Sequence, residues 1–260
     1  FNPREQSYDA AIRADSFPLN SFLPADSLGI VDLTLQARGT GFDPLLPRTR
    51  TSLRAQIDRA EFGGRDFGGI ELDAELDSQR LSGRISDRDE ALRLLLSVSG
   101  TLTEREQRIG LSGSVFGFDL AALGVSPEPI GGSFALDASA SAAGKGAYAA
   151  RIALDSIEIR NKHRTDRIRP TSVSLHTDSA ATRAEAASGD LSLTFSTPQS
   201  ADSLIAALTR SARALAGQID AQSIDMEQLK PALPDFALRV SAGPDNILNS
   251  LLKSRKIAFD

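Results

Sequence analysis

The chain has 260 residues, 41% hydrophobic and 24% charged, which is typical of a soluble folded protein with one large β domain or two ordinary domains. Its formal net charge of −5 does not favour nucleic acid or anionic membrane surfaces, so nucleic acid is not an expected partner. The absence of cysteine excludes disulfides, cysteine-based zinc sites and thiol nucleophiles.

No apolar run approaches the roughly 20 residues of a membrane-spanning helix, and the first residues given do not show the pattern expected of a signal peptide. The chain starts abruptly at Phe1 and stops at Asp260, where a new strand is expected to begin. We therefore expect it to be an internal piece of a longer protein.

Along most of the chain, apolar residues occupy every second position, in about thirteen short segments. This alternation predicts an all-β protein of antiparallel strands, each with one apolar and one solvated face. Glycine-containing turns separate the segments, as at Gly63-Gly64 and Gly144-Lys145-Gly146. The expected apolar face consists of Val31, Leu33, Leu35, Leu53, Ile57, Ile70, Leu72, Leu76, Leu94, Leu96, Val98, Leu111, Val115, Phe134, Leu136, Ile152, Leu154, Val173, Leu175, Leu191, Leu193 and Phe195.

One clear helical pattern covers residues 198–222, with Thr197 expected to cap it and Pro198 at its first position. Its apolar side is formed by Leu204, Leu208, Ala212, Leu215 and Ile219. The pattern predicts an ordinary helix packed on a sheet, because many small alanines disfavour a membrane-surface helix. A second short helix is expected over residues 246–253.

A similar arrangement occurs three times: a short helix-like piece, a proline-containing turn, and an amphipathic strand that ends in small residues. The three copies begin at Pro18, Asp119 and Asp225. We therefore expect a first module over residues 1–117, a second over 118–223 that ends in the helix, and the start of a third over 224–260.

A module with one apolar face cannot bury that face alone, so stacked modules form one continuous apolar surface. The sheet can close on itself with a dry core, or it can stay curved and open as a groove that another molecule fills. Small residues on the apolar stripes, such as Ala37, Gly83 and Gly113, leave room for a close opposite wall or for an acyl chain.

The stretches SFPLNSFLPADSLGIVDLTLQARGTGFDP and FGFDLAALGVSPEPIGGSFALDASASAAG resemble the repeats of TamB-type translocation and assembly proteins, which are related to the AsmA-like family. The segment from Ala232 to Asp260 has a similar pattern. The resemblance covers most of the chain but rests on apolar spacing. It implies an elongated, curved β-taco in the periplasm of a Gram-negative bacterium, anchored in the inner membrane, whose apolar groove carries phospholipid acyl chains and supports outer-membrane biogenesis. It also implies a partner, an outer-membrane assembly barrel of the TamA type, bound through a region outside this chain.

Residues with catalytic or ligand chemistry are few, so no enzyme activity, cofactor or metal is expected. His176 has the opposite parity to Val173 and Leu175, which predicts a solvent-facing side chain rather than a catalytic base. His163 lies among cations in residues 160–169, which predicts a solvated hairpin. A phosphate-binding patch is the alternative for that segment.

Acidic residues gather in two places. Asp87, Asp89 and Glu90 form a turn that lacks the ligand number of a calcium loop. The second group shares one strand face and consists of Glu71, Asp73, Glu75 and Asp77. We expect a solvated face, paired across the sheet with the region of Arg54 and Arg59, and the alternative is a catalytic site of the kind that β-helix enzymes carry.

Two functions of different classes remain: a groove that carries lipid, and a closed structural or adhesive β-solenoid without cargo. The substitution Leu94→Asp separates them. In an open groove it blocks lipid passage and leaves the fold mostly intact, whereas in a closed core it buries an unpaired charge and unfolds the domain.

Overall fold

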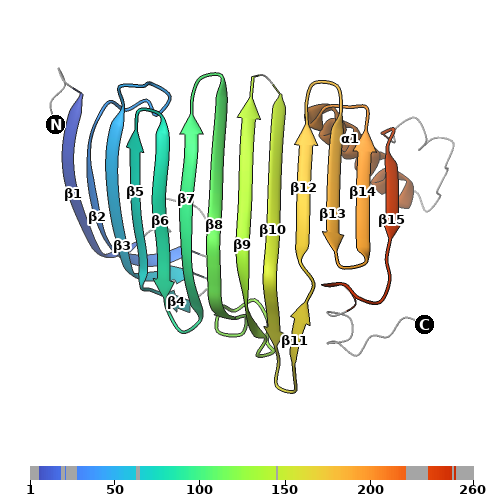
Figure 1. Cartoon of the computed structure of the whole chain (residues 1–260), viewed down its shortest axis with the longest axis horizontal. Coiled ribbons are helices and arrows are strands. Elements are labelled where there is room, and N and C mark those ends of the chain that lie inside the picture. The colour runs from blue at the N-terminus through green and yellow to red at the C-terminus, as the bar shows by residue number, and fades with distance from the viewer. Residues whose placement is uncertain are drawn as a thin grey trace. The chain divides into compact units, whose positions relative to one another are not determined.

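The computed structural model describes residues 6–18, 21, 28–62, 65–144, 146–220, 234–247 and 249. These residues form β-strands and one long helix (Figure 1), so the expected all-β antiparallel class is confirmed. The elements are β1 (Ser7–Pro18), β2 (Leu28–Thr40), β3 (Arg50–Phe62), β4 (Arg65–Phe67), β5 (Ile70–Asp77), β6 (Arg80–Arg88), β7 (Leu92–Leu102), β8 (Glu106–Asp119), β9 (Gly131–Ala143), β10 (Ala147–Arg160), β11 (Thr165–Ile168), β12 (Thr171–Thr177), β13 (Thr182–Ser188), β14 (Leu191–Thr197), α1 (Ala201–Asp220) and β15 (Ala237–Ser241).

The strands hydrogen-bond in chain order, from β1 through β3, β5 to β10 and β12 to β15, while β4 pairs with β3 and β11 with β10. Contacts divide the chain into two compact units, which we describe separately. Unit 1 comprises residues 1–139 and 152–170, and unit 2 comprises 140–151 and 171–260. The module limits expected from the sequence concern repeats and stay a prediction.

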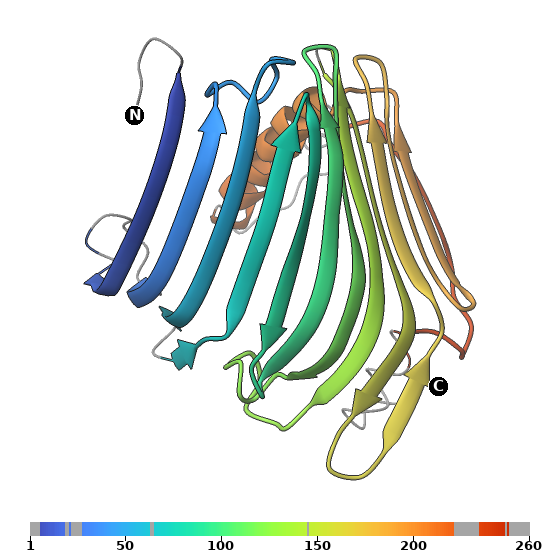
Figure 2. The same cartoon turned by 60° about the vertical axis from the view of Figure 1, so that its left-hand side comes forward.

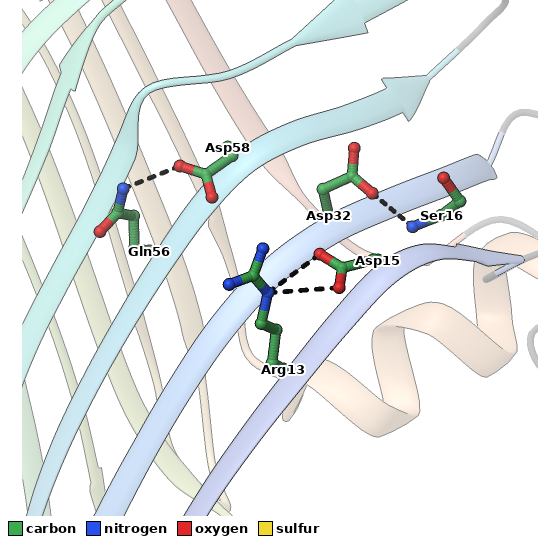
Figure 3. A network of polar contacts seen from close by, with 6 residues as sticks. All are labelled: Arg13, Asp15, Ser16, Asp32, Gln56 and Asp58. Atoms are coloured by element: carbon green, nitrogen blue, oxygen red, sulfur yellow. Dashed lines mark hydrogen bonds and ion pairs between the residues drawn. The ribbon is translucent and has the colours of Figure 1, made fainter.

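Bulges interrupt the long strands of unit 1. After Ala14, β1 contains an extra residue, and Ser16 takes a φ of 54°. The carboxylate of Asp32 on β2 accepts a hydrogen bond from the backbone N–H of Ser16 (Figure 3). Beside it, Arg13 Nε lies 3.1 Å from an oxygen of Asp15. The extra residue is thus held by side chains on the polar side of the strand.

Further irregularities occur on neighbouring strands. On β3 the register shifts at Asp58, whose carboxylate accepts a 2.7 Å bond from Gln56. On β8 the shift leaves Phe116 without a paired residue, and on β10 Ser156 has a φ of 53°. Bulges bend strands and increase their twist, and the long strands β5 to β8 curve along their length (Figure 2).

The turns of unit 1 use the chemistry that the sequence indicates. The short helix-like piece expected at Asp119 is a single turn, in which Leu123 N–H donates to Asp119 O at 2.9 Å. The carboxylate of Asp119 accepts the N–H of Ala121 at 2.8 Å. Arg65 on β4 donates to the carbonyl oxygens of Ala121 and Ala122 at 2.8 Å each, so the turn is bonded at both ends.

Five strands were not foreseen individually: β1, β4, β6, β11 and β13. β6 and β13 contain few large apolar residues, and β1 ends at Pro18, which pairs with Ile30. The helix-like piece expected to start at Pro18 is therefore wrong at that residue, because the sheet register includes it. The corresponding pieces at residues 22–23 and 225–229 lie outside the described residues, whereas the turn at Gly144 and Gly146 is confirmed by φ values of 58° and 85°.

In unit 2, α1 begins three residues later than expected. Ser200 is the capping residue, since its hydroxyl accepts the N–H of Ser203 at 3.3 Å. Thr197, the expected cap, is the last residue of β14 and donates to the carbonyl oxygen of Asp235 at 2.6 Å. The helix is described to Asp220, and most of the second helix expected over 246–253 lies outside the described residues.

Candidate functional site

Cross-strand pairing places the apolar positions of β1 to β8 on one face of the unit 1 sheet. Every sequence-predicted position from Val31 to Val115 lies on this face, which we call the apolar face of unit 1. One row across the strands consists of Ile12, Leu35, Ala55, Leu72, Ile85, Leu96 and Gly113. The next row consists of Ala10, Ala37, Leu53, Ala74, Gly83, Val98 and Leu111.

Large and small residues stand opposite one another in these rows. Gly113 pairs with Leu96, and a Cβ at Gly113 would lie 2.1 Å from the carbonyl oxygen of Leu95. Gly83 pairs with Val98 and Ala74, and a Cβ there would lie 3.3 Å from the Cβ of Ala74. The small residues therefore permit close backbone approach and lower the height of the face at those points.

Most side chains on this face are half-buried. Leu96 and Val115 are 8% and 6% exposed, whereas Ile12 and Ile109 are 51% and 43% exposed. Every described strand of unit 1 belongs to the same sheet, and its described residues contain no helix. No second layer of the unit therefore lies against the apolar face in the described part of the chain.

Aromatic side chains cover glycines at the edges of this face. Tyr8 lies over Gly39, where an added Cβ would be 2.6 Å from the phenol oxygen. The Tyr8 hydroxyl is 2.7 Å from Thr51 Oγ1, and its ring stacks on Phe42 at 5.3 Å. Such rings shield a backbone that glycine leaves open.

The remaining predicted residues of unit 1 lie on β9 and β10. Phe134 and Leu136 are half-buried, and Phe134 meets Phe118 at a ring distance of 6.0 Å. Phe118 pairs with Leu92, which has the parity of the apolar face. On β10, Leu154 is half-buried and Ile152 is 49% exposed.

Beyond Leu154, the alternation points to Ser156 as the next apolar-face position, but Ser156 is exposed with a φ of 53°, and its neighbour Ile157 is 5% exposed. Sequence reasoning missed Ile157 because simple alternation from Ile152 and Leu154 assigns it to the polar face.

The five predicted residues of unit 2 also share one face. Val173 pairs with Ala186, which pairs with Leu193, and Leu175 continues through Ala184 to Phe195. Leu191 belongs to the same side, opposite Ser188. The start of α1 lies at one end of this face, and its Leu204 and Ala207 are 9% and 4% exposed, whereas Val173 and Leu175 are 49% and 41% exposed.

A chain of hydroxyl groups joins α1 to this face. The N–H of Ala201 donates to Thr177 Oγ1 at 3.0 Å, and Thr182 Oγ1 donates to the carbonyl oxygen of Gln199 at 2.8 Å. Thr177 and Thr182 are 2.8 Å apart and 1% and 4% exposed. Because the one proton of Thr182 goes to Gln199, Thr177 must be the donor of the pair, so every buried hydroxyl is satisfied.

The opposite end of the same face has a second polar cluster. Ser188, 1% exposed, accepts the N–H of Ile247 at 3.2 Å. Asn246, 3% exposed, donates to the carboxylate of Asp190 at 2.8 Å. This bond and the N–H of Asp245 lower the pKa of Asp190. In unit 2, residues of the same unit thus form hydrogen bonds to buried polar groups at both ends of the face.

The acidic strand face of β5 is exposed and paired as expected. Asp73 lies 2.9 Å from Arg54, and Asp77 lies 2.9 Å from Arg50. Arg59 pairs instead with Asp66, at 2.9 Å. These cross-strand ion pairs support the interpretation of a solvated face. No group of three or more His, Cys, Asp or Glu side chains in the described residues is arranged to hold a metal ion.

Both histidines lie where the sequence predicts, His176 on the polar face and His163 in an exposed hairpin turn. His176 is exposed and pairs with Arg183 on the polar side of β13. His163 lies in the turn of the β10–β11 hairpin, where Asn161 accepts its N–H at 2.9 Å. Of the cations in that hairpin, Arg164 pairs with Asp166 at 2.7 Å and Arg167 with Glu158 at 3.0 Å, which weakens the case for a phosphate-binding patch.

Asp87 differs from the other acids, because it has the parity of the apolar face. It pairs with Leu94 and is 6% exposed. Its carboxylate accepts the N–H of Asp89 at 2.8 Å. Burial raises its pKa, and the charge of Asp89 adds to this, although backbone hydrogen bonds from Asp89 and Arg88 act in the opposite direction.

Two large apolar residues lie on the polar face of unit 1, and sequence reasoning missed both. Leu95 pairs with Ser86 and is 40% exposed, and the bulged Phe116 is 58% exposed. A signal was available, because adjacent residues of a strand point to opposite faces, so the middle residue of Leu94-Leu95-Leu96 cannot share the apolar face. They line a cavity of about 670 Å³ with Arg84, Arg88, Arg93 and other polar residues.

Comparison with known proteins identified no match: no family model, curated protein or solved structure is significantly similar to this chain. The resemblance to TamB-type repeats therefore stays a prediction. In the described part of the chain, no helix has the length and apolar character needed to span a membrane.

Proposed function

We propose that the apolar face of unit 1 binds phospholipid acyl chains, and that the protein is a periplasmic lipid carrier of the TamB type. The observation that carries this proposal is the set of half-buried Leu, Ile and Val side chains that lie in rows across the curved strands of unit 1. No second layer lies against these rows in the described part of the unit. A large apolar surface in contact with water is costly and generally marks a binding site.

Acyl chains fit this surface chemically. Each methylene group removed from water contributes about 0.8 kcal/mol, so long chains gain enough to remain bound without specific polar contacts. Glycine and alanine opposite leucine give the face an uneven height, which suits a flexible chain better than a flat partner. The resemblance adds two further proposals: phospholipid moves between the inner and outer membranes, and an outer-membrane assembly barrel binds segments outside this chain.

The experiment that tests this proposal is detergent-free purification, extraction with organic solvent and mass spectrometry of the extract. We expect phospholipid in a stoichiometric amount. Leu35→Asp places a charge on the apolar face, so this variant should stay folded and lose most of its lipid. Thr34→Asp is the matched control, because it adds the same charge at the next residue, on the polar face, and should retain lipid.

Two results would overturn the proposal. A lipid-free, monomeric wild-type protein with cooperative thermal unfolding would mean that the apolar faces close on each other, as in a structural β-solenoid. Equal lipid content in the folded Leu35→Asp and Thr34→Asp variants would mean that lipid binds somewhere other than this face.

A further inference from the structure

The polar face of unit 1 contains the cavity of about 670 Å³ that surrounds Leu95 and Phe116. Its floor is formed by β5, β6 and β7, and Phe116 reaches it from β8. All of its lining residues belong to unit 1. Leu95 and Phe116 lie on the polar face, whereas Leu94 and Asp87, which also line the cavity, have the parity of the apolar face.

The carboxylates of the cavity already have partners. Asp73 is bonded to Arg54 at 2.9 Å, and Glu71 accepts a 3.3 Å bond from Ser86. Asp87 accepts the backbone N–H of Asp89. Asp73 also stands directly opposite Arg84 across β5 and β6, so the acids of the cavity lie nearer to Arg84 in the register, whereas no acid stands opposite Arg88 or Arg93 on β6 and β7.

The three arginines of the cavity are in the opposite situation. Arg84, Arg88 and Arg93 are exposed, and none of them has an ion pair with another described residue. Arg88 and Arg93 stand directly opposite each other on β6 and β7. Like charges directly opposite across strands repel, so this pair is unfavourable until an anion lies between the two side chains.

The apolar residues lie among these cations. Leu95 is two positions after Arg93 on the same face of β7, and its cross-strand partner Ser86 lies between Arg84 and Arg88 on β6. A bulge exposes Phe116 on the neighbouring strand, and bulges often re-aim a side chain at a functional site. Planar guanidinium groups bind phosphate bidentately, and an exposed ring binds an apolar group beside it.

We propose that this cavity binds a phosphate monoester that carries an apolar group, with Arg88 and Arg93 on the phosphate, Arg84 as a third cation, and Leu95 and Phe116 on the apolar part. The ligand is either a phospholipid with a monoester head group or a soluble aromatic phosphate. The site lies on the face opposite the proposed acyl-chain surface and does not depend on that surface.

Calorimetric titration of the full chain tests the site with two probes: monomeric dihexanoyl phosphatidic acid and phenyl phosphate. We expect saturable binding of one molecule per chain for at least one probe. The double variant Arg88→Gln with Arg93→Gln should raise Kd at least tenfold. The matched control is Arg80→Gln with Arg105→Gln, which removes the same charge from unit 1 outside the cavity and should change Kd by less than about twofold.

Two further variants separate the parts of the site. Phe116→Ser should weaken binding of the better probe several-fold and leave inorganic phosphate binding unchanged, because only the apolar contact is removed. Leu35→Asp should leave binding of both probes unchanged, because it alters the other face. Tighter binding of the phosphatidic acid supports a lipid ligand, and tighter binding of phenyl phosphate supports a soluble one.

The proposal is overturned if neither probe shows saturable binding at millimolar concentration. It is also overturned if the folded Arg88→Gln, Arg93→Gln variant binds as tightly as wild type, or if the control pair weakens binding equally. A loss of phosphatidic acid binding in Leu35→Asp alone would assign that probe to the apolar face.

Discussion

The two units differ in what the rest of each unit contributes to the apolar face of its strands. In unit 2, α1 is hydrogen-bonded to one end of the face, with Leu204 and Ala207 buried, and a second polar cluster lies at the other end, while Val173 and Leu175 are 49% and 41% exposed. In unit 1, the corresponding face extends over β1 to β8 without a second layer in the described residues. The same alternating pattern therefore forms a face joined to a helix at one end in unit 2, and a face without a helix of its own unit in the described part of unit 1.

This difference predicts unequal costs for a buried charge. Ala207→Asp places a carboxylate on the buried side of α1 and should lower the free energy of unfolding by about 3 kcal/mol, because the charge has no partner there. Leu35→Asp, on the half-buried face of unit 1, should cost no more than about 1 kcal/mol. Urea unfolding followed by circular dichroism measures both.

The control for the helix is Ala206→Asp, which adds the same residue at an exposed position and should be nearly neutral. An equal loss of unfolding free energy in the Ala207→Asp and Leu35→Asp variants would contradict the comparison. It would mean that both positions are shielded from water to the same extent.

A smaller effect is expected at the hydroxyl chain of unit 2. Thr182→Val removes the donor to Gln199 and the acceptor for Thr177, and should cost about 1–3 kcal/mol because both partners stay buried. Thr182→Ser keeps the hydroxyl and should recover most of that loss. Equal unfolding midpoints for the Val and Ser variants would show that the hydroxyl chain does not hold α1.

The smallest effect is the pH dependence of Asp87 in unit 1. Its folded-state pKa is raised by burial, so the folded state binds more protons than the unfolded state as pH rises from about 3.9 to the raised value. The unfolding free energy that this group contributes is fully present at low pH and is lost across that window.

Asp87→Asn removes this titration and keeps an oxygen that can accept the Asp89 N–H. The variant should therefore gain stability relative to wild type at pH 7 and show a smaller gain at pH 3, as measured by urea unfolding at both values. If the difference in unfolding free energy between Asp87→Asn and wild type is the same at pH 3 and pH 7, the carboxylate of Asp87 is well hydrated in the folded state.

Much of the fold could be predicted from the sequence, because strand parity is a local property. The positions from Leu53 to Val115 were assigned to one face correctly, since each strand alternates without interruption there. Prediction failed where parity breaks, at Ser156 with Ile157, and where a strand lacks large apolar residues, as in β13. The sequence-based prediction also misplaced the helix cap. Thr197 belongs to β14, and its hydroxyl donates to the carbonyl oxygen of Asp235.

By itself, the sequence determined which residues are apolar, which strand faces they share, and that catalytic and metal-binding groups are scarce. Only the tertiary structure decided which faces are covered, that Asp87 stands on an apolar face, and that three unpaired arginines meet two exposed apolar side chains. The physical reason is separation along the chain. Alternation depends on residues that are neighbours in the sequence, whereas the burial of a face and the balance of its charges depend on residues far apart in the sequence that the sheet register brings together.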